Sequence, residues 1–379
     1  MSGSDDPRAL FALDPTVTFL NHGSFGATPR PVLAAQARLR EEMEAEPVLF
    51  LARQLGPRLE AVRAEMAAFV GADVDGLVLV PNATTGVNAV LHSLDWGTGD
   101  EILCADQSYH AVLQTVRSLV DRVGVRLVQA RVPFPIEDPE GIVAGYAAAI
   151  TARTRLLIVD HIASATGLVM PVEALVRLAH ERGLPILVDG AHAPGHLPLD
   201  LAALGADFYT GNLHKWAYAP KGTALLSIAP RWRGRIHPVT ISHAYGLDWR
   251  AEFDWTGTFD PTAWLAVPEA LRFWRAHLGV ADTCHALVRE GRQRVADALG
   301  VSLPHPDDRR YYGGMAVIPF PSGVPARVHA LTGRLFDEHR IEVPFTTYDH
   351  RVWVRISANL YNRPEDYLRL ADVLRSGWK

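Results

Sequence analysis

The chain has 379 residues, of which 48% are hydrophobic and 21% charged, and its formal net charge is −5. This length and composition are typical of a globular protein with two domains. The negative charge balance supplies no basic field for nucleic acid, so we expect no nucleic-acid partner.

Cysteine usage and apolar runs exclude further classes. The two cysteines, Cys104 and Cys284, cannot form a disulfide framework, and neither belongs to a C-x-x-C pair, so no metal site is expected. The first residues show no basic region followed by an apolar run. No apolar run approaches the roughly 20 residues that a membrane helix needs. We therefore expect a soluble cytoplasmic enzyme with no membrane partner.

The first part of the chain predicts a short apolar segment, a tight loop and two helices. The apolar segment is 17–20, the loop is 21–26, and the helices are expected from Pro29 to about Glu46 and from Gly56 to Val70. Short apolar runs then alternate with helical segments. Strands are predicted at 77–80, 101–104, 126–130, 155–159, 185–188, 207–210 and 223–228, with a proline-rich connection after residue 130. This alternation predicts an α/β fold whose mostly parallel sheet is covered by helices on both faces.

The remainder predicts a second unit. Residues 229–260 are expected to be irregular and 261–300 largely helical, followed by strands at 314–319 and 352–356 and helices at 326–340 and 364–376. We expect three parts. They are an N-terminal segment of residues 1–20 that packs with the small domain, a large domain of residues 21–260, and a small α+β domain of residues 261–379.

Lysine is rare in this chain, which has 37 Lys and Arg but only three lysines: Lys215, Lys221 and Lys379. Arg cannot replace Lys where an amine must lose its proton near neutral pH and attack a carbonyl to form a Schiff base. Enzymes that use pyridoxal phosphate (PLP) depend on this reaction and place an Asp or Arg at the pyridine nitrogen. Lys215 follows a predicted strand and is the candidate, with an ordinary surface lysine as the alternative.

Polar residues follow four of the predicted strands. Ligands of open α/β sheets bind at the carboxyl ends of the strands, so these residues are expected to lie together. They are Asn82, Thr84, Thr85, Tyr109, His110, Asp189, His192, Asn212, His214 and Lys215. These are the residue types that a PLP site needs.

Each of these positions has a second interpretation. Thr84 and Thr85 open a helix whose N–H groups favour a phosphate, although a simple Thr N-cap is the alternative. A buried Asp189 would keep a pyridinium proton in place, unless it caps the next turn. His192 could donate to the phenolate oxygen of the cofactor or cap its loop. His110 could stack on the pyridine ring and transfer protons, or face solvent.

Arg355 lies within an apolar strand, where a guanidinium needs a partner. A substrate carboxylate bound through two hydrogen bonds is one such partner, and an internal Asp or Glu is the other.

Taken together, these motifs resemble the class V (fold type I) aminotransferase superfamily over about residues 15–375, and within it the isopenicillin N epimerase-like branch. The segments that carry the resemblance are Leu20–Gly26, Asn82–Gly86, Asp189–His192, Leu213–Trp216, Trp255–Thr258 and Arg355–Asn362. The resemblance implies the PLP-dependent transferase fold of type I. In that fold a large domain with a mostly parallel sheet between helices is joined to a smaller C-terminal α+β domain.

The resemblance also implies residue roles. The implied cofactor-binding residues are Thr84, Thr85, His110, Asp189, His192, Asn212, His214, Lys215 and Thr258, and the implied substrate-binding residues are Asn21, His22 and Arg355. Lys215 would form the Schiff base, Asp189 would face the pyridine nitrogen, and His110 would stack on the ring, and these three would be catalytic. Thr258 would reach the phosphate in the neighbouring subunit's site, which implies a homodimer with shared active sites.

Two departures from the family pattern affect the expected function. Relatives that desulfurate cysteine carry a catalytic Cys on a loop before the residue that matches Arg355, whereas no Cys follows Cys284 here. Cysteine desulfurase activity of that type is therefore not expected. The epimerase-like branch is expected to carry Arg after Gly-Thr, where this chain has Phe259, so its substrate specificity is expected to differ.

The resemblance implies chemistry at the α-carbon of an amino acid or small peptide through a Lys215 aldimine. Proton removal and return on the opposite face would give an epimerase or racemase, with His22, His110 or Tyr109 as the second acid. Loss of a β or γ substituent would give a C–S or C–N lyase, and reprotonation at the cofactor carbon an aminotransferase. A non-catalytic PLP-fold binding protein is the alternative from another class. A nucleotide-dependent dehydrogenase lacks support, because no G-x-G-x-x-G follows the early strands.

Overall fold

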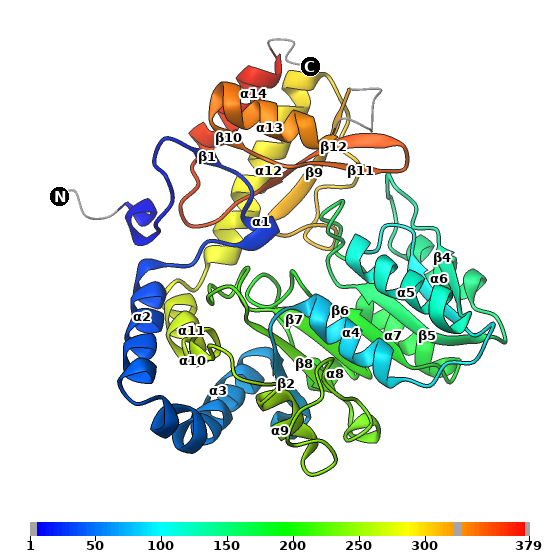
Figure 1. The fold of residues 1–379 in the computed structure, drawn as a ribbon. Helices are drawn as coiled ribbons and strands as arrows, with labels where there is room; N and C mark the ends of the chain where they lie inside the picture. The colour runs from blue at the N-terminus through cyan, green and yellow to red at the C-terminus, as the bar shows by residue number, and fades with distance from the viewer. Residues whose placement is uncertain (1–5, 322–327, 376–379) are drawn as a thin grey trace.

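The computed structural model describes residues 6–321 and 328–375 of the chain (Figure 1). A seven-stranded sheet lies at its centre, in the order β2–β8–β7–β6–β5–β3–β4. Its strands are β2 (Leu77–Val80), β3 (Glu101–Ala105), β4 (Arg126–Ala130), β5 (Thr154–Asp160), β6 (Ile186–Asp189), β7 (Phe208–Asn212) and β8 (Ala224–Ile228). Strand β8 is antiparallel to both of its neighbours, and every other pair is parallel. The predicted α/β fold with a mostly parallel sheet is confirmed.

Helices cover both faces of this sheet because its strands are apolar on both faces. In β3, Leu103 and Ala105 belong to one buried cluster, while Ile102 and Cys104 belong to a second cluster on the other face. After the helical turn α1 (His22–Phe25), the helices before residue 280 are α2 (Arg30–Ala45), α3 (Leu55–Val70), α4 (Ala83–Ser93), α5 (His110–Val123), α6 (Glu140–Ala149), α7 (Val172–Glu181), α8 (Leu201–Leu204), α9 (Trp249–Asp254), α10 (Thr262–Leu265) and α11 (Val267–Ala276). Shorter turns are η1 (Pro7–Leu10), η2 (Leu49–Gln54), η3 (Val74–Gly76) and η4 (Pro230–Trp232).

Helix α6 lies where the sequence predicts only a proline-rich connection, so that prediction was incomplete. The helix starts directly after Pro139 and buries only Ile142 and Tyr146, which are four residues apart. The other residues of the helix include Gly and several Ala, so the sequence shows little of the 3.6-residue apolar period that marks a helix.

A second, three-stranded antiparallel sheet follows in the last part of the chain. It consists of β11 (Phe345–Tyr348), β12 (Arg351–Ser357) and β9 (Met315–Phe320), accompanied by helices α12 (Val280–Leu299), α13 (Val328–His339) and α14 (Pro364–Arg375). Strand β1 (Thr18–Phe19) pairs in parallel with β10 (Ile341–Glu342), so the N-terminal segment lies beside the C-terminal part of the chain (Figure 1). Helices α10 and α11 pack against α2 and α3. The domain boundaries expected at residues 20 and 260 remain predictions.

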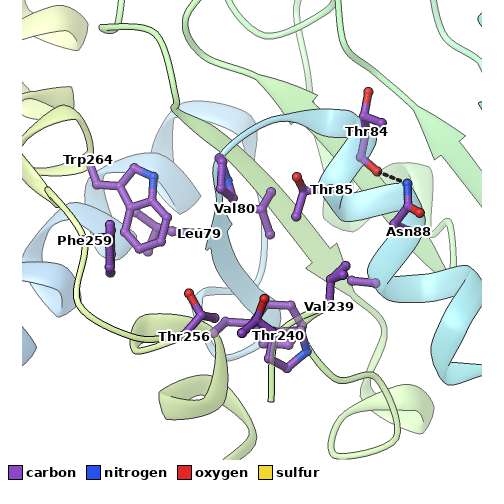
Figure 2. Close-up of a pocket in the computed structure, with 14 residues that line it drawn as sticks. Leu79, Val80, Thr84, Thr85, Asn88, Val239, Thr240, Thr256, Phe259 and Trp264 are labelled. Carbon is purple, nitrogen blue, oxygen red and sulfur yellow. Dashed lines mark hydrogen bonds between the residues drawn. The ribbon is translucent and has the colours of Figure 1, made fainter. Parts of the chain in front are cut away.

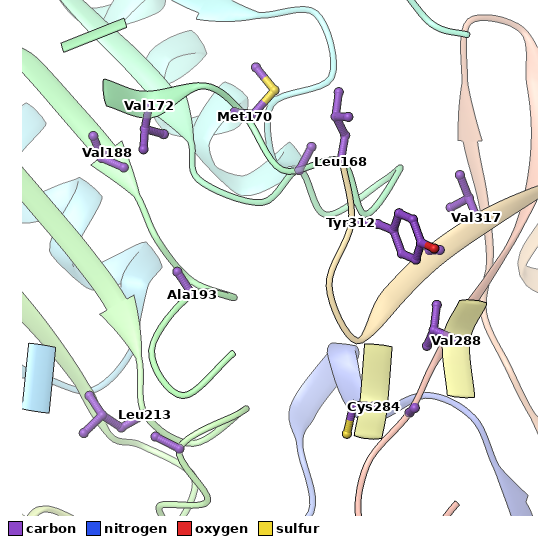
Figure 3. Packing of buried hydrophobic residues seen from close by; sticks show 14 of the residues in the cluster. Leu168, Met170, Val172, Val188, Ala193, Leu213, Cys284, Val288, Tyr312 and Val317 are labelled. Carbon is purple, nitrogen blue, oxygen red and sulfur yellow. The ribbon is translucent and has the colours of Figure 1, made fainter. Parts of the chain in front are cut away.

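One apolar cluster connects the two sheets. It runs from Val188 and Leu213 beside the large sheet to Cys284 and Val288 on α12 and Val317 on β9 (Figure 3). Because buried apolar side chains are close-packed, this shared cluster fixes the position of β12 relative to the strand ends of the large sheet.

The segment 21–26 was expected to be a tight loop, and this expectation is wrong. It forms a single helical turn, α1 (His22–Phe25), which is closed by a hydrogen bond of 2.8 Å from Gly26 N–H to the His22 carbonyl oxygen. Gly26 ends the turn with a φ of 70°, a left-handed conformation that costs other residues energy.

No helix of the described ranges is long and apolar enough to cross a membrane. Within the same ranges, no group of three His, Cys, Asp or Glu side chains is arranged to hold a metal ion.

We predict that Gly26→Ala destabilises the protein by roughly 2–5 kcal/mol, from left-handed strain and overpacking together. A Cβ at residue 26 would lie 2.4 Å from the His214 carbonyl oxygen and 2.8 Å from Lys215 Cα, and backbone atoms cannot move aside cheaply. Denaturant unfolding measures the change. Gly56→Ala is the control, because Gly56 lies in α3 with open space around it. This substitution should stabilise the protein by up to about 1 kcal/mol. Equal stability of the two variants would contradict the packing described.

Candidate active site

A cavity of about 480 Å³ lies at the carboxyl ends of β5, β6 and β7. Open α/β sheets bind their ligands at this edge. Its lining consists of Ser24, Phe25, Asn82, Ala83, Thr84, Thr85, Tyr109, Asp160, Ile162, Ser164, Asp189, Ala191, His192, Asn212, His214 and Lys215. The structure thus brings together nine of the ten candidates that follow strands: Asn82, Thr84, Thr85, Tyr109, Asp189, His192, Asn212, His214 and Lys215.

Lys215 is positioned by the loop that follows β7. Its Nζ lies 3.2 Å from His192 Nε2. Burial lowers the pKa of Lys215 to about 7, with a further decrease from the positive charge of Arg355 and an opposing effect of Asp189. The amine is therefore largely unprotonated just above neutral pH, which is the form that attacks carbonyls and accepts protons.

Lys221, the other described lysine, has a structural role. Its Nζ donates to the Gly26 carbonyl oxygen at 3.0 Å and to Thr28 Oγ1 at 3.2 Å. These bonds connect the residues after α1 to the loop that follows β7. Lys221 does not line the cavity.

Asp189 and His192 present unsatisfied polar groups beside the lysine. Asp189 accepts one hydrogen bond, from Ala191 N–H at 3.0 Å, and burial raises its pKa. Burial keeps the pKa of His192 well below its usual value, so the ring is neutral, and its Nδ1 is buried without a hydrogen-bond partner in the described chain. Both side chains therefore retain capacity to bind a polar ligand.

The first turn of α4 forms the opposite wall. Asn212 Oδ1 accepts a hydrogen bond from Ala83 N–H at 2.8 Å, and Asn82 Oδ1 accepts one from Thr85 N–H at 2.9 Å. Both Thr84 and Thr85 face the cavity at a helix N-terminus, where an anion is favoured. The Asn212 amide thereby ties the end of β7 to this turn.

His214 lies beside this turn. Its Nδ1 donates to the Thr223 carbonyl oxygen at 3.1 Å, since a carbonyl can only accept. Burial lowers the pKa of His214 to about 4, so the free ring is neutral.

Arg355 on β12 is buried and forms no ion pair with any Asp or Glu among the described residues. Its Nη1 donates to the Ser164 carbonyl oxygen at 2.6 Å and lies 3.2 Å from Ser164 Oγ, and its Nη2 donates to Ser24 Oγ at 2.8 Å. Burial lowers the pKa of Arg355 to about 10, which leaves it charged at neutral pH. The internal carboxylate that was the alternative partner for this guanidinium is not found in the described chain.

A chain of hydrogen bonds continues from Arg355 to a distant carboxylate. Ser24 Oγ donates to Asn21 Oδ1 at 2.5 Å, and Asn21 Nδ2 donates to Glu342 Oε1 at 2.9 Å. Asn21 does not line the cavity and reaches it only through Ser24.

His22 lies beneath the lysine loop, outside the cavity. Its Nδ1 is 2.7 Å from Tyr361 Oη and its Nε2 is 3.1 Å from the Lys215 carbonyl oxygen. Burial lowers its pKa to about 3. Both ring nitrogens are engaged, so this geometry gives His22 a contact with the lysine backbone and not with a ligand.

Two further candidates lie outside the lining. His110 is exposed at the start of α5, where its Nε2 lies 2.8 Å from the Gln114 side-chain nitrogen, and its neighbour Tyr109 faces the cavity instead. Thr258 is exposed on the segment after α9. The ring-stacking role of His110 and the contact of Thr258 with a second subunit remain predictions.

The comparisons with known proteins agree with this geometry. A family model described as aminotransferase class-V matches residues 26–366. The chain belongs to the class V aminotransferase family. It is 35% identical to isopenicillin N epimerase of Streptomyces clavuligerus, over 98% of this chain and 97% of that protein. It is 33% identical to putative L-cysteine desulfhydrase 1 of Oryza sativa subsp. japonica, over 94% of this chain and 82% of that protein.

Among solved structures, a C-DES mutant with glycine covalently linked to its PLP cofactor is similar with a TM-score of 0.80 and 23% identity, over 95% of this chain and 97% of that one. This likeness confirms the expected type of fold. The residues of the cavity fit PLP, because the start of α4 favours an anion, Asp189 is a buried carboxylate, and His192 Nδ1 has no partner in the described chain.

Three residues at this site were not among the candidates from the sequence. Ser24 and Ser164 both contact Arg355, and Asp160 lines the cavity. Ser24 belongs to a recognised motif and Asp160 follows a predicted strand, so both positions carried a signal. Ser164 follows an irregular segment and had none.

In apo protein, we predict that acetylation of Lys215 by acetic anhydride reaches its half-maximal rate near pH 7, because only the unprotonated amine reacts. Peptide mass mapping across pH 5–10 gives the midpoint. Arg355→Met should raise this midpoint, since it removes a neighbouring positive charge, whereas Lys221→Ala should leave it unchanged. A midpoint near the ordinary lysine value of about 10.4 would contradict the burial of the amine.

Proposed function

We propose that this protein acts at the α-carbon of an amino acid or small peptide with a free α-amino group and a free carboxylate. The observation that carries the proposal is Arg355, a buried guanidinium without a carboxylate partner in the described chain, near a lysine of lowered pKa. A buried charge of this kind is costly unless a ligand pairs with it. The protein is a PLP-dependent enzyme of class V, and PLP when bound supplies an electron sink at the α-carbon.

The cavity residues would hold this cofactor at its two ends. Thr84, Thr85, Asn212 and His214 are proposed to form the phosphate site at the start of α4. Asp189 would hold a proton on the ring nitrogen, and His192 would contact the phenolate oxygen.

Lys215 is the proposed base. Its amine is unprotonated near neutral pH, so it can take the α-proton onto Nζ. His192 Nε2, 3.2 Å away, can accept a hydrogen bond from that amine and so orient it.

Arg355 is the proposed carboxylate site, and Ser24 and Ser164 fix its guanidinium through three contacts. A planar fork of N–H donors matches a carboxylate through two hydrogen bonds. Binding at this point orients the α-carbon of the substrate toward the lysine.

Epimerisation or racemisation is the reaction we place first, in agreement with the epimerase relative. It requires a second acid that returns the proton on the opposite face. His22 is unsuitable, since both of its nitrogens are engaged and its pKa is lowered to about 3 by burial. Tyr109 lines the cavity and is the proposed second acid.

A C–S or C–N lyase is the second candidate. Elimination needs no acid on the opposite face. It therefore does not depend on Tyr109 and is compatible with the same cavity. The desulfhydrase relative agrees with this reading. Cys284 is buried with its thiol pKa raised to about 12 by burial, so it is not a persulfide acceptor.

A homodimer remains part of the proposal. Thr258 lies between Thr256 and Phe259, which line a second cavity of about 410 Å³ (Figure 2). This second cavity shares Thr84 and Thr85 with the first. An exposed Thr258 at this place is available to a neighbouring subunit.

Exchange of the α-proton tests the proposed function. The holoenzyme is incubated in deuterated water with a panel of L-amino acids, and NMR and chiral chromatography follow the products. Deuterated D-amino acid indicates epimerisation, and keto acid with a released thiol or amine indicates a lyase. No exchange with any amino acid would favour the non-catalytic alternative and contradict the proposal.

With the reacting amino acid in hand, Arg355→Lys should raise KM by at least about tenfold, since a hydrogen bond to a charged group contributes about 1.5–3 kcal/mol. The amine that corresponds to this amino acid without its carboxylate should bind wild type and Arg355→Lys with equal affinity. Arg351→Lys, on the same strand but exposed, is the control and should leave KM unchanged. An unchanged KM in Arg355→Lys would overturn the carboxylate site.

A further inference from the structure

Two carboxylates lie side by side at the edge of the large sheet that forms the cavity. Asp160 is the last residue of β5 and Asp189 the last residue of β6, and the two are direct neighbours in the strand register. Both line the cavity and both are 4% exposed. Only Asp189 has a role in the proposed function, so the second carboxylate needs its own explanation.

Two buried carboxylates at adjacent positions of neighbouring strands cannot both be ionised without cost. Neither forms an ion pair with a Lys, Arg or His of the described residues. Lys215 favours the ionised form of Asp189, whereas the charge with the largest effect on Asp160 is that of Asp189. The charge of the pair therefore falls on Asp189, and the proton on Asp160.

Asp160 also contacts the start of α5. Its Oδ1 accepts a hydrogen bond from Tyr109 N–H at 3.2 Å, and the Ser108 side chain lies near enough to lower the pKa of the carboxyl. Tyr109 is the N-cap residue of α5, and its side chain faces the cavity. A neutral carboxyl can still accept the bond from Tyr109 through its carbonyl oxygen, so Asp160 can hold this turn without a charge.

We infer that Asp160 is a positioning residue: its protonated carboxyl holds Tyr109 and the start of α5 against the cavity, and it leaves Asp189 as the single carboxylate for the cofactor. The link to the cofactor rests on the proposed function. The protonation and the contact with Tyr109 do not.

The surroundings of Asp160 support this state. The titratable and polar groups that face it from neighbouring elements are Cys104 on β3, Ser108 and Tyr109 before α5, Tyr146 on α6 and Asp189 on β6. None of these is a cation. Burial, and then the charge of Asp189, raise the pKa of Asp160 to about 7.

This raised pKa makes the stability of the folded protein depend on pH. The pKa of Asp160 is about 7 in the folded protein and about 3.9 when unfolded, so the unfolded chain releases this proton first as pH rises. Stability is therefore lost between about pH 4 and pH 7. An Asn at this position keeps the acceptor for Tyr109 and removes the titration.

The experiment compares Asp160→Asn and Asp160→Ala with wild-type holoenzyme. The Tm of Asp160→Asn relative to wild type should increase by about 2–5 °C between pH 5 and pH 8.5. Asp160→Ala should show a lower Tm than Asp160→Asn at every pH and release PLP faster on dialysis, because Tyr109 N–H loses its acceptor. If Asp160→Asn matches Asp160→Ala, or if its relative Tm falls as pH rises, the inference is overturned.

Infrared spectroscopy gives a second readout that uses the wild-type holoenzyme. A carbonyl stretch of a protonated carboxyl should be present at pH 6, should decrease with a midpoint near 7, and should be missing in Asp160→Asn. A signal that is the same in wild type and Asp160→Asn would contradict protonation of Asp160. Neither readout needs a substrate, so a failure here is distinguishable from a failure of the proposed reaction.

Discussion

Burial of the Lys215 amine is the constraint on which the rest of the site depends. An ammonium shielded from bulk water would need a carboxylate partner, and the described chain provides none in ion-pair contact. The neutral amine is favoured instead, and its pKa falls to about 7. The same burial keeps His192 neutral, so the lysine faces a ring that can orient it without adding charge. Packing thus leaves an amine that is unprotonated near neutral pH, which is the form that the proposed nucleophile and base requires.

The second constraint is the assembly of the site from distant segments. The turn α1, the end of β5 and the loop after β7 line one cavity. Arg355 of β12 contacts Ser24 and Ser164 in its wall. The hydrogen bonds from Arg355 through Ser24 and Asn21 to Glu342 connect β12, α1 and β10. Glu342 lies on β10, which pairs with β1, so the pairing of the N-terminal segment also positions the guanidinium. The proposed carboxylate site therefore depends on contacts between segments from both ends of the chain.

The sequence predicted the sheet and the residues at its strand ends, because buried parallel strands give short apolar runs that are easy to recognise. Thr84, Asp189 and Lys215 follow such runs and do lie together. Helix α6 was missed, since only Ile142 and Tyr146 mark its buried face. The turn α1 was also missed, because a single helical turn has no periodicity to read.

Contacts between distant segments were beyond sequence reasoning for a different reason. His22 is of a residue type that can donate protons, but its two ring nitrogens contact Tyr361 Oη and the Lys215 carbonyl oxygen. Only the folded chain reveals these contacts. Ser164 reaches Arg355 through a backbone carbonyl, which every residue possesses. The proton balance between Asp160 and Asp189 likewise depends on strand order, which places β5 beside β6.

The central claim is that Lys215 carries the cofactor. The most direct test is borohydride reduction of the purified protein, with the visible spectrum recorded before and after, followed by peptide mass mapping of wild type, Lys215→Ala and Lys221→Ala. We predict a yellow protein that reduction bleaches, with a pyridoxyl group on the peptide that contains Lys215 in wild type and Lys221→Ala, and no such group in Lys215→Ala. A colourless protein that stays colourless after PLP is added, or a pyridoxyl group on Lys221, would contradict the account.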